Sequence, residues 1–79
     1  MSKKDYEKRF GITAIEMGFI ISDQLIEAMR MQIEYDLSEN KHKLIGEHLV
    51  DLGYMESSEV DQVLSQMYDK KKVIGVQNN

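Results

Sequence analysis

The chain contains no cysteine, no proline and no tryptophan. Without cysteine, disulfide cross-links and cysteine redox chemistry are excluded, and we expect a cytoplasmic location. Without proline, no position forbids a helix. No apolar run approaches the ~20 residues of a membrane-spanning helix, and residues 1–5 lack the apolar segment of a signal peptide. We therefore expect no membrane insertion.

The chain is also poor in positive charge. Ten Lys and Arg residues stand against 14 Asp and Glu residues, which gives a net charge of −4. Proteins that hold nucleic-acid phosphates usually carry a basic stripe, so helix–turn–helix DNA binding is a disfavoured alternative and we expect no nucleic-acid partner. The basic residues gather near the two ends, where we expect solvated terminal charges: Lys3, Lys4, Lys8, Arg9, Lys70, Lys71 and Lys72.

An internal repeat organises the sequence. With 79 residues and a hydrophobic share of 42%, the chain suits one small domain with a thin core. Gly11 and Gly18 are seven residues apart, as are Gly46 and Gly53, and the offset between the pairs is 35. The same offset aligns further residues of like character: Phe10 with Ile45, Ala14 with Leu49, Ile15 with Val50, Phe19 with Tyr54, Ile20 with Met55, Ser22 with Ser57, Leu25 with Val60, Ala28 with Val63 and Met29 with Leu64.

Each copy reads as helix, tight turn, helix. Tyr6, Phe10, Ala14 and Met17 recur at the three- and four-residue spacing of a helical stripe. A glycine followed by a large apolar residue then indicates a Schellman C-cap. Because this pair occurs twice, as Gly18 with Phe19 and as Gly53 with Tyr54, we expect both glycines to adopt a positive φ.

The second helix of each copy starts with good capping residues: Ser22 or Asp23 in the first copy, Ser57 or Ser58 in the second. We expect the first of these helices to place Leu25, Ile26, Met29, Ile33 and Leu37 on its core side, and the second to place there Val60, Val63, Leu64 and Met67.

The predicted fold class is all-α: two tandem helix–turn–helix repeats in a compact four-helix domain with a short C-terminal extension. The domain spans residues 1–72, with repeats at about 9–37 and 43–69. Residues 73–79 form a tail that either frays or pairs as a short strand.

The predicted core comprises Phe10, Ile15, Leu25, Met29, Leu49, Leu52, Val60 and Leu64. Gly11 and Gly46 lie one turn into their predicted helices, where glycine costs ~1 kcal/mol relative to alanine. We expect close approach of a second helix there. A flat ligand, or a simple N-terminal helix boundary, is the alternative.

Residues 9–32 resemble a known 24-residue motif. They read Arg-Phe-Gly-x-x-Ala-Ile-x-x-Gly-Phe-Ile-x-x-x-x-Leu-x-x-x-Met-x-x-Gln. This pattern is similar to the tandem repeat in the N-terminal domain of type II secretion and type IV pilus assembly ATPases, some of which bind cyclic di-GMP. The resemblance covers about residues 9–67.

The resemblance implies a set of nucleotide contacts in the first copy. Arg9 matches the arginine that meets a guanine base, Phe10 an apolar contact, Gly11 the backbone approach and Gln32 the terminal polar contact. The second copy departs from the motif, with Leu44 and Met67 at its polar ends. One chain therefore offers at most half of a two-guanine site, which a homodimer could complete through an Arg9–Gln32 surface. No nucleotide-hydrolysing domain is present in this chain.

Other residues favour protein binding over catalysis. Met31 and Tyr35 fall off the main stripe of their helix and would form an apolar patch for a partner. His42 and His48 are six residues apart, which does not suit a helical metal pair, and no nucleophile–base or phosphate-loop pattern is present. We therefore expect no enzyme, no metal and no required cofactor, but a regulatory module that binds a protein partner or forms a homodimer. A cyclic di-GMP sensor is the alternative.

Overall fold

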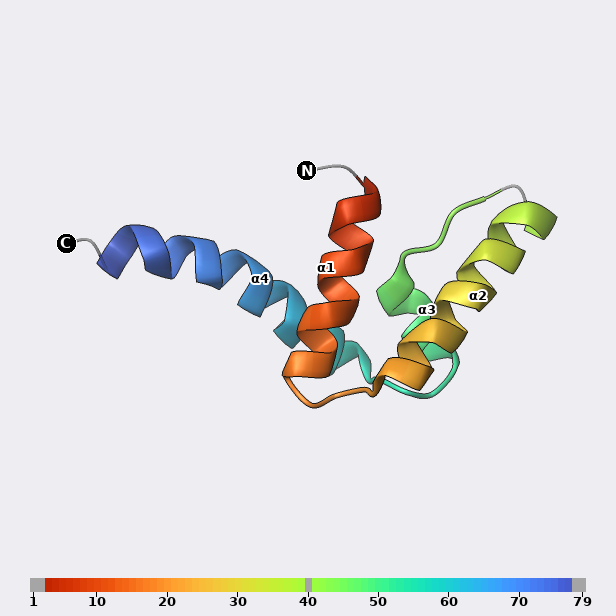
Figure 1. The fold of residues 1–79 in the computed structure, drawn as a ribbon, viewed down its shortest axis with the longest axis horizontal. Coiled ribbons are helices and arrows are strands. Elements are labelled where there is room, and N and C mark those ends of the chain that lie inside the picture. Colours follow the sequence, from red (N-terminus) through yellow and green to blue (C-terminus); the bar gives the residue numbers. More distant parts are fainter. Residues whose placement is uncertain (1–2, 40, 78–79) are drawn as a thin grey trace.

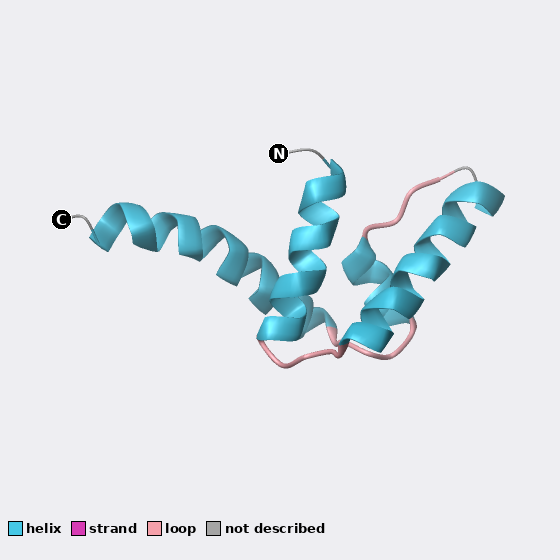
Figure 2. Cartoon of the chain, in the orientation of Figure 1, coloured by secondary structure: helices cyan, strands magenta, loops and turns pink. Residues whose placement is uncertain are grey.

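The computed structural model describes the backbone of residues 3–39 and 41–77, and the side chains of residues 6–39 and 41–68. The described residues form four helices joined by loops: α1 (Lys3–Glu16), α2 (Ser22–Glu39), α3 (Ile45–Asp51) and α4 (Ser57–Gln77) (Figures 1 and 2). The predicted all-α, four-helix class is confirmed. We expected a frayed tail or a short strand at residues 73–79. The backbone of residues 73–77 is helical, and residues 78–79 lie outside the described residues.

The two tight turns have the predicted geometry. Gly18 and Gly53 both have a φ of 83°. In the first turn, Phe19 N donates to Ala14 O at 3.0 Å and Gly18 N to Ile15 O at 2.9 Å. These two bonds define a Schellman motif. The second turn repeats both bonds at positions shifted by 35, with Tyr54 N donating to Leu49 O and Gly53 N to Val50 O, each at 2.9 Å.

The N-termini of α2 and α4 are capped differently from the prediction. The residues expected to cap through their own side chains were Ser22, Asp23, Ser57 and Ser58. Both helices instead begin at the serine itself, so its hydroxyl lies inside the helix and past the capping position. Gln24 Oε1 accepts the backbone N–H of Ile21 at 3.0 Å. Glu59 Oε1 likewise accepts that of Glu56 at 2.8 Å, so the two repeats share one capping device.

The helices pair across the repeats. α2 packs on α3, α4 packs on α1, and α1 also contacts α3. The second helix of each repeat therefore rests on the first helix of the other, in a pseudo-twofold arrangement. Figure 1 shows the C-terminal part of α4 projecting beyond the other helices, which agrees with principal extents of 49, 24 and 19 Å.

Two glycines allow close contacts between the two helices of each repeat. A Cβ atom on Gly11 would lie 2.6 Å from both methyl carbons of Leu25. A Cβ atom on Gly46 would lie 3.0 Å from the Phe10 ring and 3.3 Å from a Val60 methyl. Since Leu25 and Val60 are equivalent in the two repeats, the same contact is made twice. The predicted close approach of helices is confirmed.

The core is made of repeat-equivalent residues. Its buried members are Phe10, Ala14, Ile20, Leu25, Ala28, Ile45, Leu49, Met55 and Val63. Of the eight predicted core residues, Phe10, Leu25 and Leu49 are buried, whereas Ile15, Met29, Leu52, Val60 and Leu64 are partly buried around them. The innermost places include Ala14 and Ala28, because small side chains let helix backbones approach each other. In the described part of the chain, no helix has the length and apolar content needed to cross a membrane.

Candidate functional site

A buried carboxylate, that of Glu7, connects three parts of the domain. Glu7 is 8% exposed. Its Oε1 accepts a hydrogen bond from Gln32 Nε2 at 2.7 Å, and its Oε2 accepts one from the backbone N–H of Ile45 at 3.0 Å. Gln32 Nε2 also donates to the Lys43 carbonyl oxygen at 2.9 Å. Because Ile45 is the first residue of α3, its N–H has no acceptor within that helix. Glu7 therefore joins α1 to α2 and α3.

His42, which is exposed, extends this group towards the surface, and we call the whole set the Glu7 cluster (Glu7, Gln32, Asp36 and His42). Its Nε2 lies 3.0 Å from Glu7 Oε1, and its Nδ1 lies 3.1 Å from Asp36 Oδ2. Each nitrogen of the imidazole ring therefore faces a carboxylate oxygen. Both oxygens of Glu7 are engaged, which makes this carboxylate a structural acceptor.

The four residues carried over from the secretion-ATPase motif do not share one open surface. Phe10 is 2% exposed, and the Leu25 side chain covers Gly11. The Gln32 amide is engaged in the Glu7 cluster. Arg9 is exposed, and it lies two residues from Glu7 on α1, which places it on the opposite side of that helix. Arg9 and Gln32 thus face different directions.

The predicted partner-binding residues Met31 and Tyr35 line a hollow of about 340 Å³ between α2 and α3. Met31 is 40% exposed, and Tyr35 is half-buried. The Tyr35 ring meets the His48 ring edge-on, with centroids 5.5 Å apart. Lys43 Nζ lies 5.3 Å from the centre of the Tyr35 ring. Met31 is therefore open to a partner, while Tyr35 already packs within the domain.

His48 forms the buried wall of this hollow. The residue is 4% exposed, and its Nε2 is buried without a hydrogen-bond partner among the described residues. Burial, followed by the nearby charge of Lys43, lowers the pKa of His48 below its ordinary value of 6.5. The imidazole is therefore neutral at neutral pH, since the charged form would be poorly solvated there.

The side of α2 that faces solvent is unexpectedly apolar. Ile26, Ile33 and Leu37 are 58%, 60% and 82% exposed. Their spacing of seven and four residues places them on one stripe of the helix, with Arg30 between them. We call Ile26, Arg30, Ile33 and Leu37 the outer face of α2.

This arrangement corrects the predicted core side of α2, which had included Ile26, Ile33 and Leu37. The observed inner side begins with buried Leu25 and Ala28. It continues with Gln32, which bonds Glu7, and with Asp36, which bonds His42, while the half-buried Tyr35 packs on His48. The inner side of this half of the helix is therefore largely polar, and Ile33 and Leu37 lie outside.

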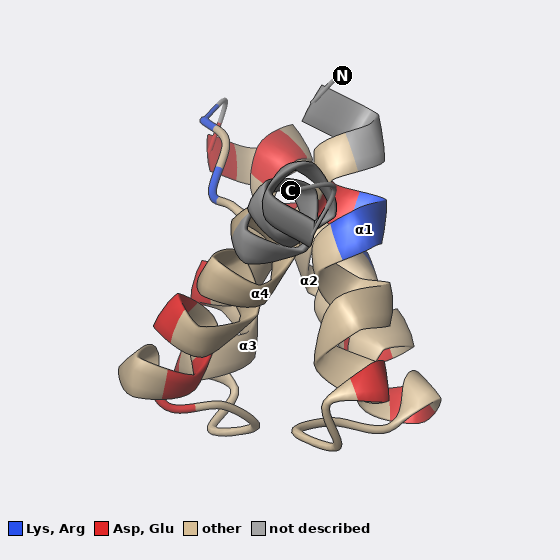
Figure 3. Ribbon diagram, turned by 90° about the vertical axis from the view of Figure 1, so that its left-hand side faces the viewer, with Lys and Arg blue, Asp and Glu red and all other residues tan. Residues whose placement is uncertain are grey.

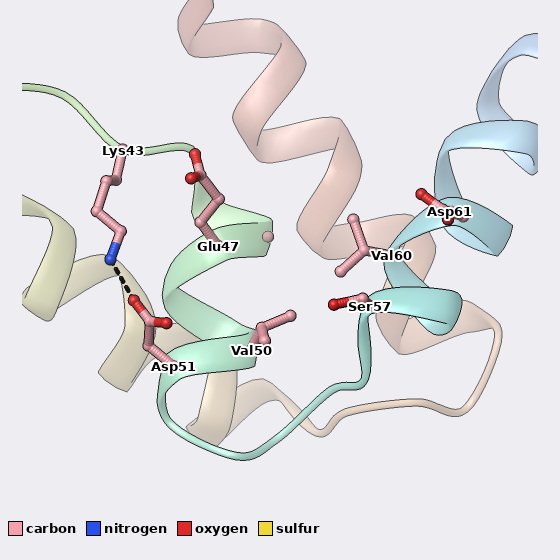
Figure 4. Close-up of a pocket in the computed structure, with 8 residues that line it drawn as sticks. Lys43, Glu47, Val50, Asp51, Ser57, Val60 and Asp61 are labelled. Carbon is pink, nitrogen blue, oxygen red and sulfur yellow. Dashed lines mark hydrogen bonds and ion pairs between the residues drawn. The ribbon is translucent and has the colours of Figure 1, made fainter.

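A further hollow, of about 330 Å³, separates α3 from the start of α4 (Figure 4). Lys43 forms an ion pair with Asp51 at its edge, and this hydrogen bond raises the pKa of Lys43. The other charged side chains at this hollow are the exposed carboxylates Glu47 and Asp61. No group of three or more His, Asp or Glu side chains in the described residues is arranged to hold a metal ion. The hollow thus offers no built ligand site.

Charge is unevenly distributed over the domain. Figure 3 shows basic ribbon segments on α1 and in the loop before α3, at the end away from the tight turns, while acidic segments extend towards the turns. α2 carries five acidic residues and one basic residue, Arg30. On α2, the acidic residues Asp23, Glu27 and Glu34 share a hollow of about 450 Å³ with Ile26 and Met31. An acidic border therefore runs beside the outer face of α2.

Sequence reasoning missed Glu7, although a signal for it is present. Glu7 precedes Phe10 by three residues and Ala14 by seven, so it falls on the stripe of α1 that is otherwise apolar. A carboxylate at such a position needs buried donors. Those donors come from residues 25 to 38 positions away, so no local pattern could have named them.

Neither family models, nor curated proteins, nor solved structures give a match to this chain. The resemblance to secretion-ATPase N-terminal domains rests on residues 9–32 and their repeat alone. The nucleotide binding that this resemblance implies stays a prediction.

Proposed function

We propose that the chain is a small non-catalytic module that binds a protein partner through the outer face of α2. The observation that carries this proposal is the exposure of Ile26, Ile33 and Leu37 on one helical stripe. Single exposed apolar residues are common, but three of them repeated along one side of a polar helix indicate an interaction surface.

The surroundings of the stripe support this reading. Met31, a residue that the sequence alone suggested for partner binding, is 40% exposed on the same helix. The buried carboxylate of Glu7 is bonded by the exposed His42 and joins the helices. The proposed function is therefore recognition, with a rigid helix presenting side chains to the partner.

Site-specific photocrosslinking in the native host would test the proposal. A photoreactive residue at Leu37 is expected to give a discrete adduct with one protein. The matched control is the same residue at Gln62, which is exposed on α4 and should give no such adduct. Indistinguishable adduct patterns at the two positions, or no adduct at Leu37, would contradict the proposal.

A second variant separates binding from folding. Ile33→Asp places a charge on an exposed position, so the free energy of unfolding should change by less than about 0.5 kcal/mol. The adduct formed from Leu37 should nevertheless disappear in this variant. If the adduct proves to be a second copy of the chain, sedimentation of the purified protein will show a dimer that Ile33→Asp dissociates.

A further inference from the structure

We propose that the occupant of the outer face of α2 is a basic amphipathic helix of another protein, an inference that rests on the proposed function and names its partner class. Charge complementarity is the reason for inferring a basic partner. α2 has five acidic residues and one arginine, and Asp23, Glu27 and Glu34 border the apolar stripe. No ion pair involving these three carboxylates occurs among the described residues. Lysine and arginine side chains flanking an apolar ridge would match this border.

The shape of the face fits a helix. Residues 26 to 37 span about three turns, or roughly 16 Å along the axis. Ile26, Ile33 and Leu37 stand on one line of that surface, as the ridge of one helix does when it enters the groove of another. A partner helix of about 12 residues with apolar side chains at matching spacing would cover the stripe. Arg30, the single cation on α2, would face one acidic residue of the partner.

A second copy of the chain fits this face less well. Pairing α2 with α2 of another molecule would bring two helices with an excess of carboxylates together, and like charges across an interface oppose association. A basic partner removes this conflict.

The test uses the full chain and two synthetic peptides. Each peptide is an alanine-rich helix of about 18 residues, long enough to be helical in water, with leucines at the spacing of one helical stripe. One peptide carries lysine at the flanking positions, and the other carries glutamate at the same positions. Amide NMR shifts of the labelled protein report where and how tightly each peptide binds.

We expect the lysine peptide to shift resonances of residues 23–37 and to bind about tenfold more tightly than the glutamate peptide, as pairs with exposed Asp23 and Glu34 and with partly buried Glu27 would give. Glu34→Lys should weaken binding of the lysine peptide several-fold. Glu16→Lys, which makes the same charge change at an exposed position of α1, should leave it unchanged. Raising the salt concentration should weaken binding, because the charges lie at the surface.

The possible failures are distinguishable. Equal binding of both peptides at residues 23–37, lost in Ile33→Asp, would overturn the basic partner and leave the proposed function standing. Binding of the lysine peptide elsewhere on the domain, or no binding of either peptide, would also overturn the inference. The proposed function itself fails if, in the crosslinking experiment, Leu37 gives no adduct or the same adduct pattern as Gln62.

Discussion

Replacing Glu7 by glutamine turns a buried acceptor into a group that is half donor. The amide oxygen can still accept from Gln32 and His42, but the amide nitrogen then faces the backbone N–H of Ile45, which Glu7 Oε2 now accepts at 3.0 Å. The change removes one hydrogen bond to a charged group, worth about 1.5–3 kcal/mol, and leaves a buried donor unpaired. We expect Glu7→Gln to lower the free energy of unfolding by about 2–4 kcal/mol, a large part of a small domain's stability.

Urea denaturation followed by circular dichroism measures this loss, and Glu16→Gln is the matched control. Glu16 lies on the same helix and is exposed, so its amide variant should stay within about 0.5 kcal/mol of the unmodified chain. Hydrogen exchange gives a second readout, since the Ile45 amide should lose protection in Glu7→Gln. A Glu7→Gln chain as stable as the control, with Ile45 still protected, would refute the assigned role of the cluster.

Three other predictions rest on the fold and a fourth on the sequence resemblance. Gly18→Ala and Gly53→Ala should each cost about 1 kcal/mol in urea denaturation, because alanine is strained at positive φ although nothing lies within 4 Å of the new Cβ; unchanged midpoints would contradict this. Leu49→Ala removes a side chain that is 0% exposed and should cost about 2–5 kcal/mol by the same assay. Because the pKa of His48 is lowered in the folded state, the free energy of unfolding should fall as the pH drops below 6.5. Between about pH 7.5 and 5.5, the His48→Phe variant should lose less of this free energy than the unmodified chain; equal losses in the two proteins would rule this cause out. From the sequence resemblance, we expect isothermal titration to show weak or no binding of cyclic di-GMP to the monomer; tight binding that ignores Arg9→Ala would remove that hypothesis.

Local sequence signals predicted the parts of the fold that depend on backbone conformation. Gly18 and Gly53 could be placed in left-handed turns because few other residues accept a positive φ. The repeat offset then predicted equivalent environments, and Gly11 and Gly46 indeed receive equivalent neighbours. These features need only the identity of a residue and its spacing.

The orientation of α2 could not be predicted in this way. Apolar residues occur on two sides of the helix, so its periodicity fits either side. The orientation of α2 depends on Glu7. Gln32 donates a hydrogen bond to Glu7, and Asp36 is connected to Glu7 through His42, so both residues lie on the inner side of the helix. Ile33 and Leu37 are left outside as a result. The orientation of α2 could not be predicted because it depends on these long-range contacts. The same contacts place Ile33 and Leu37 on the outer face of α2.

The pairing of helices across the two repeats has a consequence for how the domain folds. Within a single repeat the helices meet mainly where Leu25 covers Gly11 and Val60 covers Gly46, because α2 rests on α3 and α4 on α1. We expect that two fragments cut in the loop before α3 would each require the other. The intact chain is geometrically a dimer of half-size units in which the loop that includes residues 41–44 serves as a tether. Such a tether converts an association of two molecules into a step within one molecule, at an effective concentration of about the millimolar range. The free energy of unfolding of the domain should therefore not depend on the protein concentration.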